Sequence, residues 1–173
     1  VTVEYGIETS NDNTLKLINR GHDFATTKRA VEMTAERGIT VGGHVIIGLP
    51  GETAEDSIRQ ADDMSQLPLD ILKIHQMQII KGTKLADIYS KTPFPLYSPE
   101  EYMEVIVRYL EHLRPDMVVE RFASQSPKDM LIAPHWGLKN YELTNLIVNK
   151  MRKEGRRQGS LAKSKSLSAD MSL

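Results

Sequence analysis

Hydrophobic and polar positions follow two different periods along this chain. Four stretches, residues 1–8, 39–49, 70–80 and 117–123, have the alternating or continuous apolar pattern of β-strands. The stretches between them have apolar residues at helical spacing. We expect helices over residues 12–19, 24–37, 99–113 and 140–153, and two more that begin after Thr53 and Thr83.

Local signals at the boundaries support these elements. Ser98, Pro99 and Glu101 occupy the N-cap, N1 and N3 positions of a helix start, and Thr53 with Asp56 has the spacing of a capping box. Strands that alternate with crossover helices predict a parallel α/β sheet, either open or part of a barrel. In both, the ligand site lies at the carboxyl ends of the strands. The loops to search are residues 8–11, 48–53, 78–83 and 124–126.

Composition narrows the class of protein. The chain has 173 residues, the length of one domain, and 22 basic against 23 acidic residues. This balance gives no electrostatic argument for nucleic acid or membrane binding, and no apolar run reaches the ~20 residues of a membrane helix. Cysteine is absent, which excludes disulfides and any thiolate-held iron–sulfur cluster within these residues. The start has no secretory signal pattern, so we expect a cytoplasmic protein.

Both ends of the chain have unusual patterns. Val1 is not an initiator methionine and already lies in the first strand, which predicts that the chain is cut from a longer protein. The lost neighbour would leave that strand with an unpaired edge, and we expect self-association there. Residues 154–173 are rich in serine, lysine and arginine and have no aromatic residue. We therefore expect residues 1–153 to be folded and residues 154–173 to be a disordered tail.

Candidate chemistry begins in the first strand. Alternation puts Glu4, Gly6 and Glu8 on one face, and two carboxylates in a buried strand are costly without partners. This pattern is typical either of a ligand-facing surface or of an edge strand that faces solvent. His44 and His75 lie in strands, where both a hydrogen-bonded core histidine and a ligand contact are compatible with the pattern.

The turn at residues 48–53 is rich in glycine and joins a strand to a helix. Leu49 and Pro50 replace the Lys and Ser/Thr of a phosphate loop, so the turn is either a plain tight turn or an anion site at the helix start. No histidine pair has metal-ligand spacing, and no serine lies in a nucleophile elbow. We therefore assign no catalytic and no metal-binding residue. Lys81, after the third strand, is either an anion contact or a solvated lysine.

Three segments together resemble the second half of a radical SAM domain. They are residues 4–10 (EYGIETS) with 15–22 (LKLINRGH), residues 44–53 (HVIIGLPGET), and residues 73–75 (KIH) with 80–83 (IKGT). The resemblance is closest to the bacterial YhcC-like iron–sulfur oxidoreductases, which are related to the Elp3 and oxygen-independent coproporphyrinogen oxidase branches. It covers about residues 1–153. It implies a partial (β/α) TIM-like barrel segment with parallel strands, without the N-terminal part of the barrel.

The resemblance also implies two cofactors. In that superfamily a 4Fe–4S cluster held by three cysteines binds S-adenosylmethionine (SAM), and here those cysteines would lie upstream of Val1. Glu8 matches a position at the SAM ribose hydroxyls, and Arg20 matches an arginine that pairs with the methionine carboxylate. His44 matches a second ribose position, which is often acidic in relatives. The other implied SAM contacts are Ser10 beside Glu8, Ile46 and Gly48 against adenine, and the adenine-facing backbone of Met77 and Gln78.

The function that the resemblance implies belongs to a longer parent protein. That parent would use an electron donor to cleave SAM reductively and would direct the resulting 5′-deoxyadenosyl radical at an unknown substrate. The chain alone would be inactive in this reaction, because it has no cysteine. Two alternatives stay open. One is a cofactor-free α/β binding module that presents its loops to a partner, and the other is half of an ordinary TIM-barrel lyase with Lys73 or Lys81 as its amine.

Overall fold

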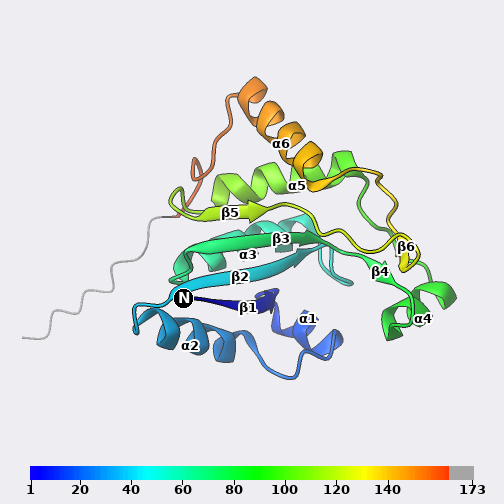
Figure 1. Cartoon of the computed structure of the whole chain (residues 1–173), viewed down its shortest axis with the longest axis horizontal. Helices are drawn as coiled ribbons and strands as arrows, with labels where there is room; N and C mark the ends of the chain where they lie inside the picture. The colour runs from blue at the N-terminus through cyan, green and yellow to red at the C-terminus, as the bar shows by residue number, and fades with distance from the viewer. Residues whose placement is uncertain (164–173) are drawn as a thin grey trace, which may run out of the picture.

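The computed structural model describes residues 1–163 and has a parallel sheet at its centre (Figure 1). Its strand order is β1-β2-β3-β5, and every neighbouring pair is parallel. The strands are β1 (Thr2–Glu8), β2 (Thr40–Ile47), β3 (Ile71–Gln76) and β5 (Val118–Arg121). The sequence-based prediction of an α/β fold with a parallel sheet is confirmed.

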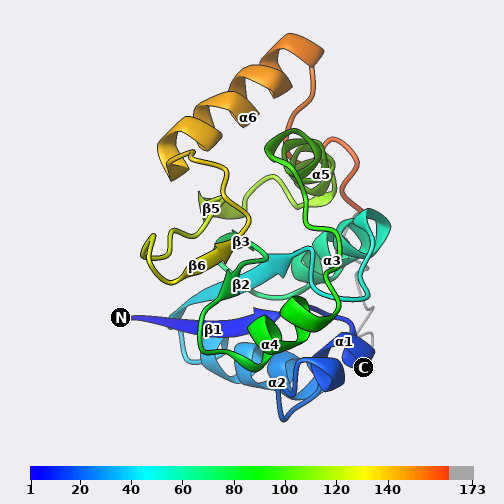
Figure 2. The ribbon, with the colours of Figure 1, turned by 90° about the vertical axis from the view of Figure 1, so that its right-hand side faces the viewer.

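Helices follow the strands. They are α1 (Asp12–Leu17), α2 (Phe24–Ala35), α3 (Ala54–Gln66), α4 (Lys84–Lys91), α5 (Pro99–His112) and α6 (Asn140–Glu154). Of these, α2, α3 and α5 lie along one face of the sheet, α6 packs on α5, and α4 lies beside β4 (Ile79–Ile80) at the end of the sheet (Figure 2). The capping boxes expected at Thr53 and Ser98 are both present. Within residues 1–163, none of these helices is long and apolar enough to cross a membrane.

The core lies between the sheet and the helices. Ile7, Val45 and Leu72 are fully buried on the helix-covered face, and the two largest buried side chains, Tyr102 and Tyr109, come from α5. The hydroxyl of Tyr102 donates to the carbonyl of Phe122 at 2.6 Å, which ties α5 to the end of β5. Because side chains alternate along a strand, this burial leaves every second residue for the opposite face.

The third strand is shorter than the sequence predicts. β3 ends at Gln76, and β4 (Ile79–Ile80) leaves the main sheet to pair antiparallel with β6 (Leu131–Ala133). Gln76 forms two hydrogen bonds with the backbone of Ser124, at 2.9 and 2.8 Å. The prediction of one strand over residues 70–80 is therefore wrong. Its continuous apolar pattern spans two strands that belong to different sheets.

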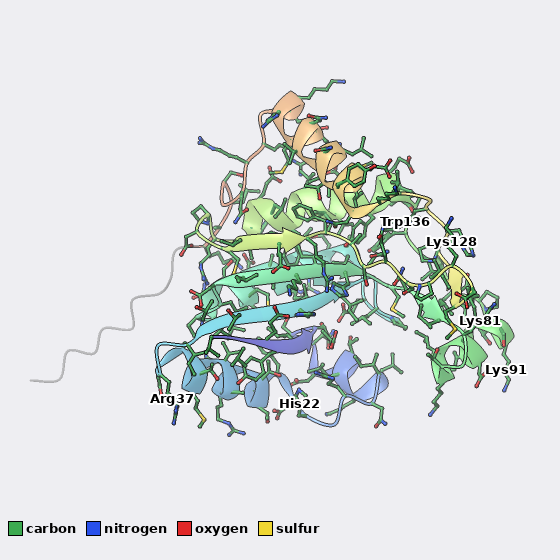
Figure 3. All side chains as sticks on the ribbon, in the orientation of Figure 1. His22, Arg37, Lys81, Lys91, Lys128 and Trp136 are labelled. Atoms are coloured by element: carbon green, nitrogen blue, oxygen red, sulfur yellow. The ribbon has the colours of Figure 1, made fainter. Side chains whose placement is uncertain are left out.

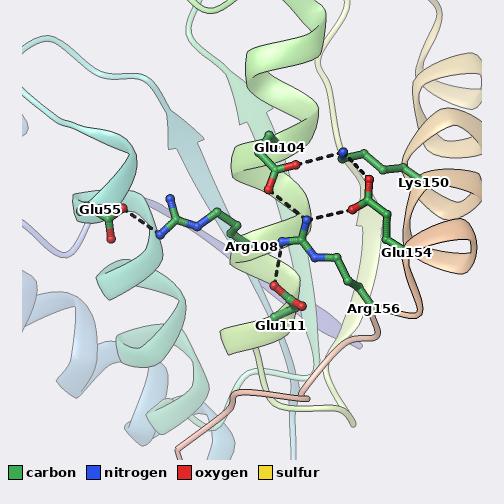
Figure 4. Close-up of polar contacts among 7 residues, drawn as sticks. All are labelled: Glu55, Glu104, Arg108, Glu111, Lys150, Glu154 and Arg156. Atoms are coloured by element: carbon green, nitrogen blue, oxygen red, sulfur yellow. Dashed lines mark hydrogen bonds and ion pairs between the residues drawn. The ribbon is translucent and has the colours of Figure 1, made fainter.

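The segment after α6 is fastened to α5 by charge pairing. The Arg156 guanidinium binds the carboxylates of Glu104 and Glu111 on α5, at 2.9 and 2.8 Å. It also binds Glu154 at the end of α6, and Lys150 bridges Glu104 and Glu154 from the same helix (Figure 4). Figure 4 also shows a separate pair in which Arg108 joins α5 to Glu55 of α3. We call the contacts of Arg156 the C-terminal clasp.

Backbone hydrogen bonds also join the segment after α6 to α5. The N–H of Gly159 donates to the carbonyl of Leu110 at 3.0 Å. The expected disorder is therefore wrong for residues 154–163, because a pattern of apolar residues carries no information on ion pairs between distant segments. The same expectation for residues 164–173 lies outside the part of the chain that the structure describes.

We predict that Arg156→Met lowers the free energy of unfolding by about 1–3 kcal/mol, because it leaves the half-buried carboxylates of α5 without their shared partner. Urea unfolding followed by circular dichroism measures this loss. Arg157→Met is the matched control, since Arg157 is exposed and forms no ion pair within residues 1–163. Equal loss in the two variants would contradict the clasp.

Candidate functional site

The face of the sheet opposite the helices, here called the inner face, carries most of the charged residues of the strands. Glu4, Gly6 and Glu8 of β1 project there, as do His44 of β2 and Lys73 of β3, because their neighbours in each strand face the core. The alternation that predicted one polar face on the first strand is thus repeated in three strands. This face is the candidate functional site.

Glu4 joins β1 to β3 across the strand between them. Its two carboxylate oxygens accept from Nζ of Lys73 at 2.6 Å and from Nε2 of His44 at 2.7 Å. Lys73 also pairs with Glu120 of β5 at 3.4 Å. The position opposite Glu4 on β2 is Gly42, where a Cβ would lie 3.0 Å from Cγ of Glu4. Without a side chain at residue 42, Glu4 lies across β2 and reaches Lys73.

We call Glu4 and the side chains bonded to it, His44 and Lys73, the Glu4 network. Their contacts determine which of these groups are charged. The hydrogen bond from Lys73, followed by that from His44, lowers the pKa of Glu4 to about 2. The same hydrogen bond raises the pKa of Lys73 above its ordinary value. Glu4 and Lys73 are therefore both ionised at neutral pH, and a protonated amine is not a nucleophile. This weighs against Lys73 as the amine of a lyase.

Glu8 and Arg20 meet at the carboxyl end of β1. Nη2 of Arg20 donates to the carbonyl of Gly6 at 2.5 Å and lies 3.7 Å from Oε1 of Glu8. A Cβ on Gly6 would stand 2.6 Å from Oε1 of Glu8 and 2.7 Å from Nη2 of Arg20, so any other residue there would move the ends of these two side chains. Burial raises the pKa of Glu8, and the charge of Arg20 opposes that rise.

The loop after β1 is tied to the loop after β2. Oγ1 of Thr9 donates to Oε1 of Glu52 at 2.5 Å, and Nε2 of Gln60 donates to the carbonyl of Glu8 at 3.3 Å. Burial raises the pKa of Glu52, while the Thr9 hydrogen bond opposes it. Glu52 is the acidic residue of the glycine-rich turn, so this turn serves to hold the two loops together.

A cavity of about 440 Å³ lies beyond the carboxyl ends of β2 and β3. Gly48 and Met77 line it, together with Phe94, Tyr97 and Trp136. Gly48 has φ of 88°, and a Cβ there would lie 3.1 Å from the Tyr97 ring. Figure 3 shows Trp136 at this end of the sheet, where its Nε1 donates to the carbonyl of Tyr97 at 3.0 Å. Such walls suit a flat heterocycle.

The remaining residues implied by the resemblance fall into different places. Ile46 lies on the inner face, paired in register with His75. Gln78 is held by the protein itself, because its Oε1 accepts from Oγ of Ser126 at 2.9 Å. The N–H of Met77 donates to Ile47 at 2.9 Å, so it is taken up within the sheet. The structure thus brings Glu8, Arg20, His44 and Ile46 to one face and Gly48 and Met77 to its rim, whereas Ser10 lies apart in a surface pocket with Asp56 and Arg59 of α3.

Two further residues lie on the inner face: His75, for which the sequence leaves a core histidine and a ligand contact open, and Arg121, which no sequence pattern singles out. His75 lies beside His44, with ring centroids 5.5 Å apart, and burial lowers its pKa to about 4. Arg121 stands in register with Lys73, two residues before His75 in β3, and its charge contributes to that lowering of the pKa. The sequence feature that could have found His75 is the one that marks Glu4. A charged or polar residue stands on the face of a strand whose alternate positions are apolar.

The polar side chains of the inner face fit SAM, but the described residues do not fit a 4Fe–4S cluster. Within residues 1–163, no group of three or more histidine, cysteine, aspartate or glutamate side chains could hold a metal ion. The chain has no cysteine, so it offers no thiolate to an iron–sulfur cluster. In contrast, Arg20 has a buried Nε without a partner, and the cradle at Gly6 would be filled by any Cβ. A ligand that carries a carboxylate and hydroxyl groups, as SAM does, is compatible with these groups.

Two family models match consecutive parts of the chain. The model of the radical SAM superfamily matches residues 1–63, and the model of the radical SAM C-terminal domain matches residues 69–153. The first match contains β1, β2 and the inner-face residues Glu4 and Arg20. The second contains β3, β5 and all of α6 except its last residue, Glu154.

Individual relatives cover the same region. The uncharacterised protein MJ0486 of Methanocaldococcus jannaschii is 31% identical over 92% of this chain and 50% of its own length. YhcC of Escherichia coli is 31% identical over 79% of this chain and 44% of its own length. The chain thus spans about half the length of these relatives. In the solved structure of Methanocaldococcus infernus Elp3 with an N-terminal deletion, 91% of this chain and 37% of that chain superpose with a TM-score of 0.81 and 25% identity.

We predict that the Glu4 carboxylate stays ionised down to about pH 3, well below an ordinary glutamate. Because its pKa in the folded state is lowered, the network contributes stability above about pH 4.5 and loses it as the pH falls toward about 2. Carboxyl carbon NMR shifts of Glu4 measure this directly. Lys73→Met should raise the pKa of Glu4 toward its ordinary value, whereas Lys84→Met, at an exposed lysine of α4, should not. A normal Glu4 pKa in the unaltered chain would refute the network.

Proposed function

The chain belongs to the radical SAM superfamily, and we propose that its inner face holds SAM in a longer enzyme whose 4Fe–4S cluster is bound by cysteines outside these 173 residues. The matched relatives are about twice as long as the aligned region, which leaves room for such a segment. The cluster and SAM would together supply hydrogen-atom abstraction from an unidentified substrate, with an external electron donor.

Arg20 carries this proposal. Its guanidinium is held at the carboxyl end of β1 by the Gly6 carbonyl, and its Nε is buried without a partner. Glu8 at 3.7 Å is a loose partner for a group that prefers short, two-point contacts with a carboxylate. We therefore assign the methionine carboxylate of SAM to Arg20. Glu8, with its burial and raised pKa, is left to accept from the ribose hydroxyls.

The remaining SAM contacts follow from the same arrangement. Because Nε2 of His44 is taken up by Glu4, Nδ1 is the ring nitrogen left for a second ribose hydroxyl. Ile46, Gly48 and Met77 form an apolar strip from the inner face to the rim of the cavity, and we assign adenine to it. Ser10 and the backbone of Gln78 are the assignments with least support, because Ser10 lies against α3.

We expect the 173-residue chain to bind SAM weakly, on the order of micromolar or weaker, since cluster chelation is missing. Arg20→Met should weaken that binding about tenfold or more, because it removes a charged hydrogen bond to a carboxylate. Isothermal titration calorimetry measures both affinities. Gly6→Ala should act in the same direction, as its Cβ would displace the Arg20 guanidinium.

The matched control is Arg29→Met, which removes an exposed guanidinium on α2. It should leave SAM binding unchanged. Equal affinity of the chain and its Arg20→Met variant would sink the assignment of the carboxylate, and submicromolar binding without a cluster would contradict the proposed division of the site.

A second proposal concerns self-association. β1 stands at the edge of the described sheet and pairs only with β2. An unpaired parallel edge offers a row of N–H and C=O groups to another strand. We propose that the isolated chain associates with itself through β1. Light scattering across a concentration series should show dimers or larger species, and Val3→Pro should reduce them. A clean monomer at high concentration would rule this out.

A further inference from the structure

Arg121 occupies an irregular position on the inner face. Leu72 of β3 pairs with Val119, but the next residue, Lys73, pairs with Arg121, so Glu120 is an extra residue in β5. Such a bulge turns two consecutive side chains to the same face. Glu120 reaches Lys73 at 3.4 Å, and Arg121 stands in register with Lys73, two residues before His75 in β3. The bulge therefore delivers Arg121 to the inner face.

Arg121 differs from every other half-buried arginine of the described chain. Arg20, Arg108, Arg114 and Arg156 each have a carboxylate within ion-pair distance, the longest separation being the 3.7 Å of Arg20. Arg121 has none among residues 1–163. Its Nε is buried and has no hydrogen-bond partner. A guanidinium that has lost part of its water without gaining a carboxylate is costly, and an anion would offset that cost.

The neighbours of Arg121 do not supply the missing negative charge. Glu120 is turned to Lys73, which also holds Glu4. His75 is neutral near pH 7, because burial and the nearby Arg121 charge lower its pKa to about 4, and its Nε2 has no partner either. On the inner face, Lys73 thus shares two carboxylates, whereas Arg121 has no carboxylate within ion-pair distance among residues 1–163.

We propose that Arg121, with the unpartnered Nε2 of His75 on the same face, binds an oxyanion group, carboxylate or phosphate, of the substrate. This rests on the proposed function, in which the inner face is the site of SAM. The fork of a guanidinium matches the two oxygens of either group. Lys73 does not compete, since two carboxylates already neutralise it.

The position of Arg121 separates it from the residues assigned to SAM. Arg20 follows β1, whereas Arg121 ends β5, and these strands form opposite edges of the described sheet. Three strand spacings of about 4.8 Å put the two edges roughly 14 Å apart. This separation lets a cofactor and a substrate lie side by side on one face.

Because Arg121 would bind an oxyanion group, the class of substrate is an acidic metabolite or a phosphate-bearing compound.

The test is NMR titration of the labelled 173-residue chain with inorganic phosphate and, separately, with succinate. Side-chain signals of Arg121 and His75 are followed at neutral pH. We expect a saturable shift with a dissociation constant on the order of 10 mM or tighter for at least one probe. A response to phosphate alone points to a phosphate-bearing substrate, and a response to succinate alone points to a carboxylate.

Arg121→Met should weaken the His75 response about tenfold or more, and Arg121→Lys should weaken it less, because it keeps the charge but loses the fork. Arg37→Met is the matched control: Arg37 is exposed at the end of α2, away from the inner face (Figure 3), and its loss should change nothing. A saturable His75 response that survives Arg121→Met overturns the proposal, as does the absence of any saturable response to both probes.

Calorimetry with SAM separates this inference from the function it rests on. Arg121→Met should leave SAM affinity unchanged while the phosphate or succinate response is lost. If SAM binds through Arg20 but neither anion shifts His75, the oxyanion site fails and the SAM site stands. If an anion binds through Arg121 but SAM does not bind at all, the SAM assignment fails and the anion site stands.

Discussion

One carboxylate holds the inner face together. Glu4 lies across β2 because Gly42 has no side chain, and so it bonds both His44 of the middle strand and Lys73 of the strand beyond. A charge exposed on one strand would normally be solvated and weakly bound. Here the carboxylate is shared by two donors, which fixes three strands in register and consumes the charges of Glu4 and Lys73. This arrangement therefore decides which charged groups of the inner face are left to bind a ligand.

The consequence is a sheet with two chemically distinct faces. The face toward α3 and α5 is packed with aliphatic and aromatic side chains, while the other carries ionised groups in defined pairs. The two arginines that frame the inner face are the exceptions, since Arg20 has only a loose carboxylate and Arg121 has none among residues 1–163. A surface whose central lysine is already paired and whose arginines stand at both edges favours a ligand with separated negative groups, or two ligands.

Much of the fold follows from local patterns. The caps at Thr53 and Ser98 and the alternation in the first strand depend on neighbouring residues, so sequence reasoning finds them. The break after Gln76 depends on Ser124, which is 48 residues away, and no local pattern reports it. The clasp of Arg156 depends on charges in α5 for the same reason.

The candidate site divides in a similar way. The polar alternation at Glu4 and Glu8 and the glycine at residue 48 are visible in the sequence, and the resemblance adds Arg20. Arg121 is hidden, because a bulge in β5 decides which face it reaches. That bulge exists only in the pairing with β3. Ser10 illustrates the opposite error, since being near Glu8 in the chain does not bring its side chain to the same face.

The clasp also bears on where this fold ends. Recognisable similarity to the radical SAM C-terminal domain stops at residue 153, yet Glu154 and Arg156 tie α6 to α5 just beyond it. The border of the family model and the border of the packed structure therefore differ. Trimming this protein after residue 153 would remove the guanidinium that pairs with Glu111 and leave Glu104 with Lys150 alone, at the surface where the last helix docks on α5.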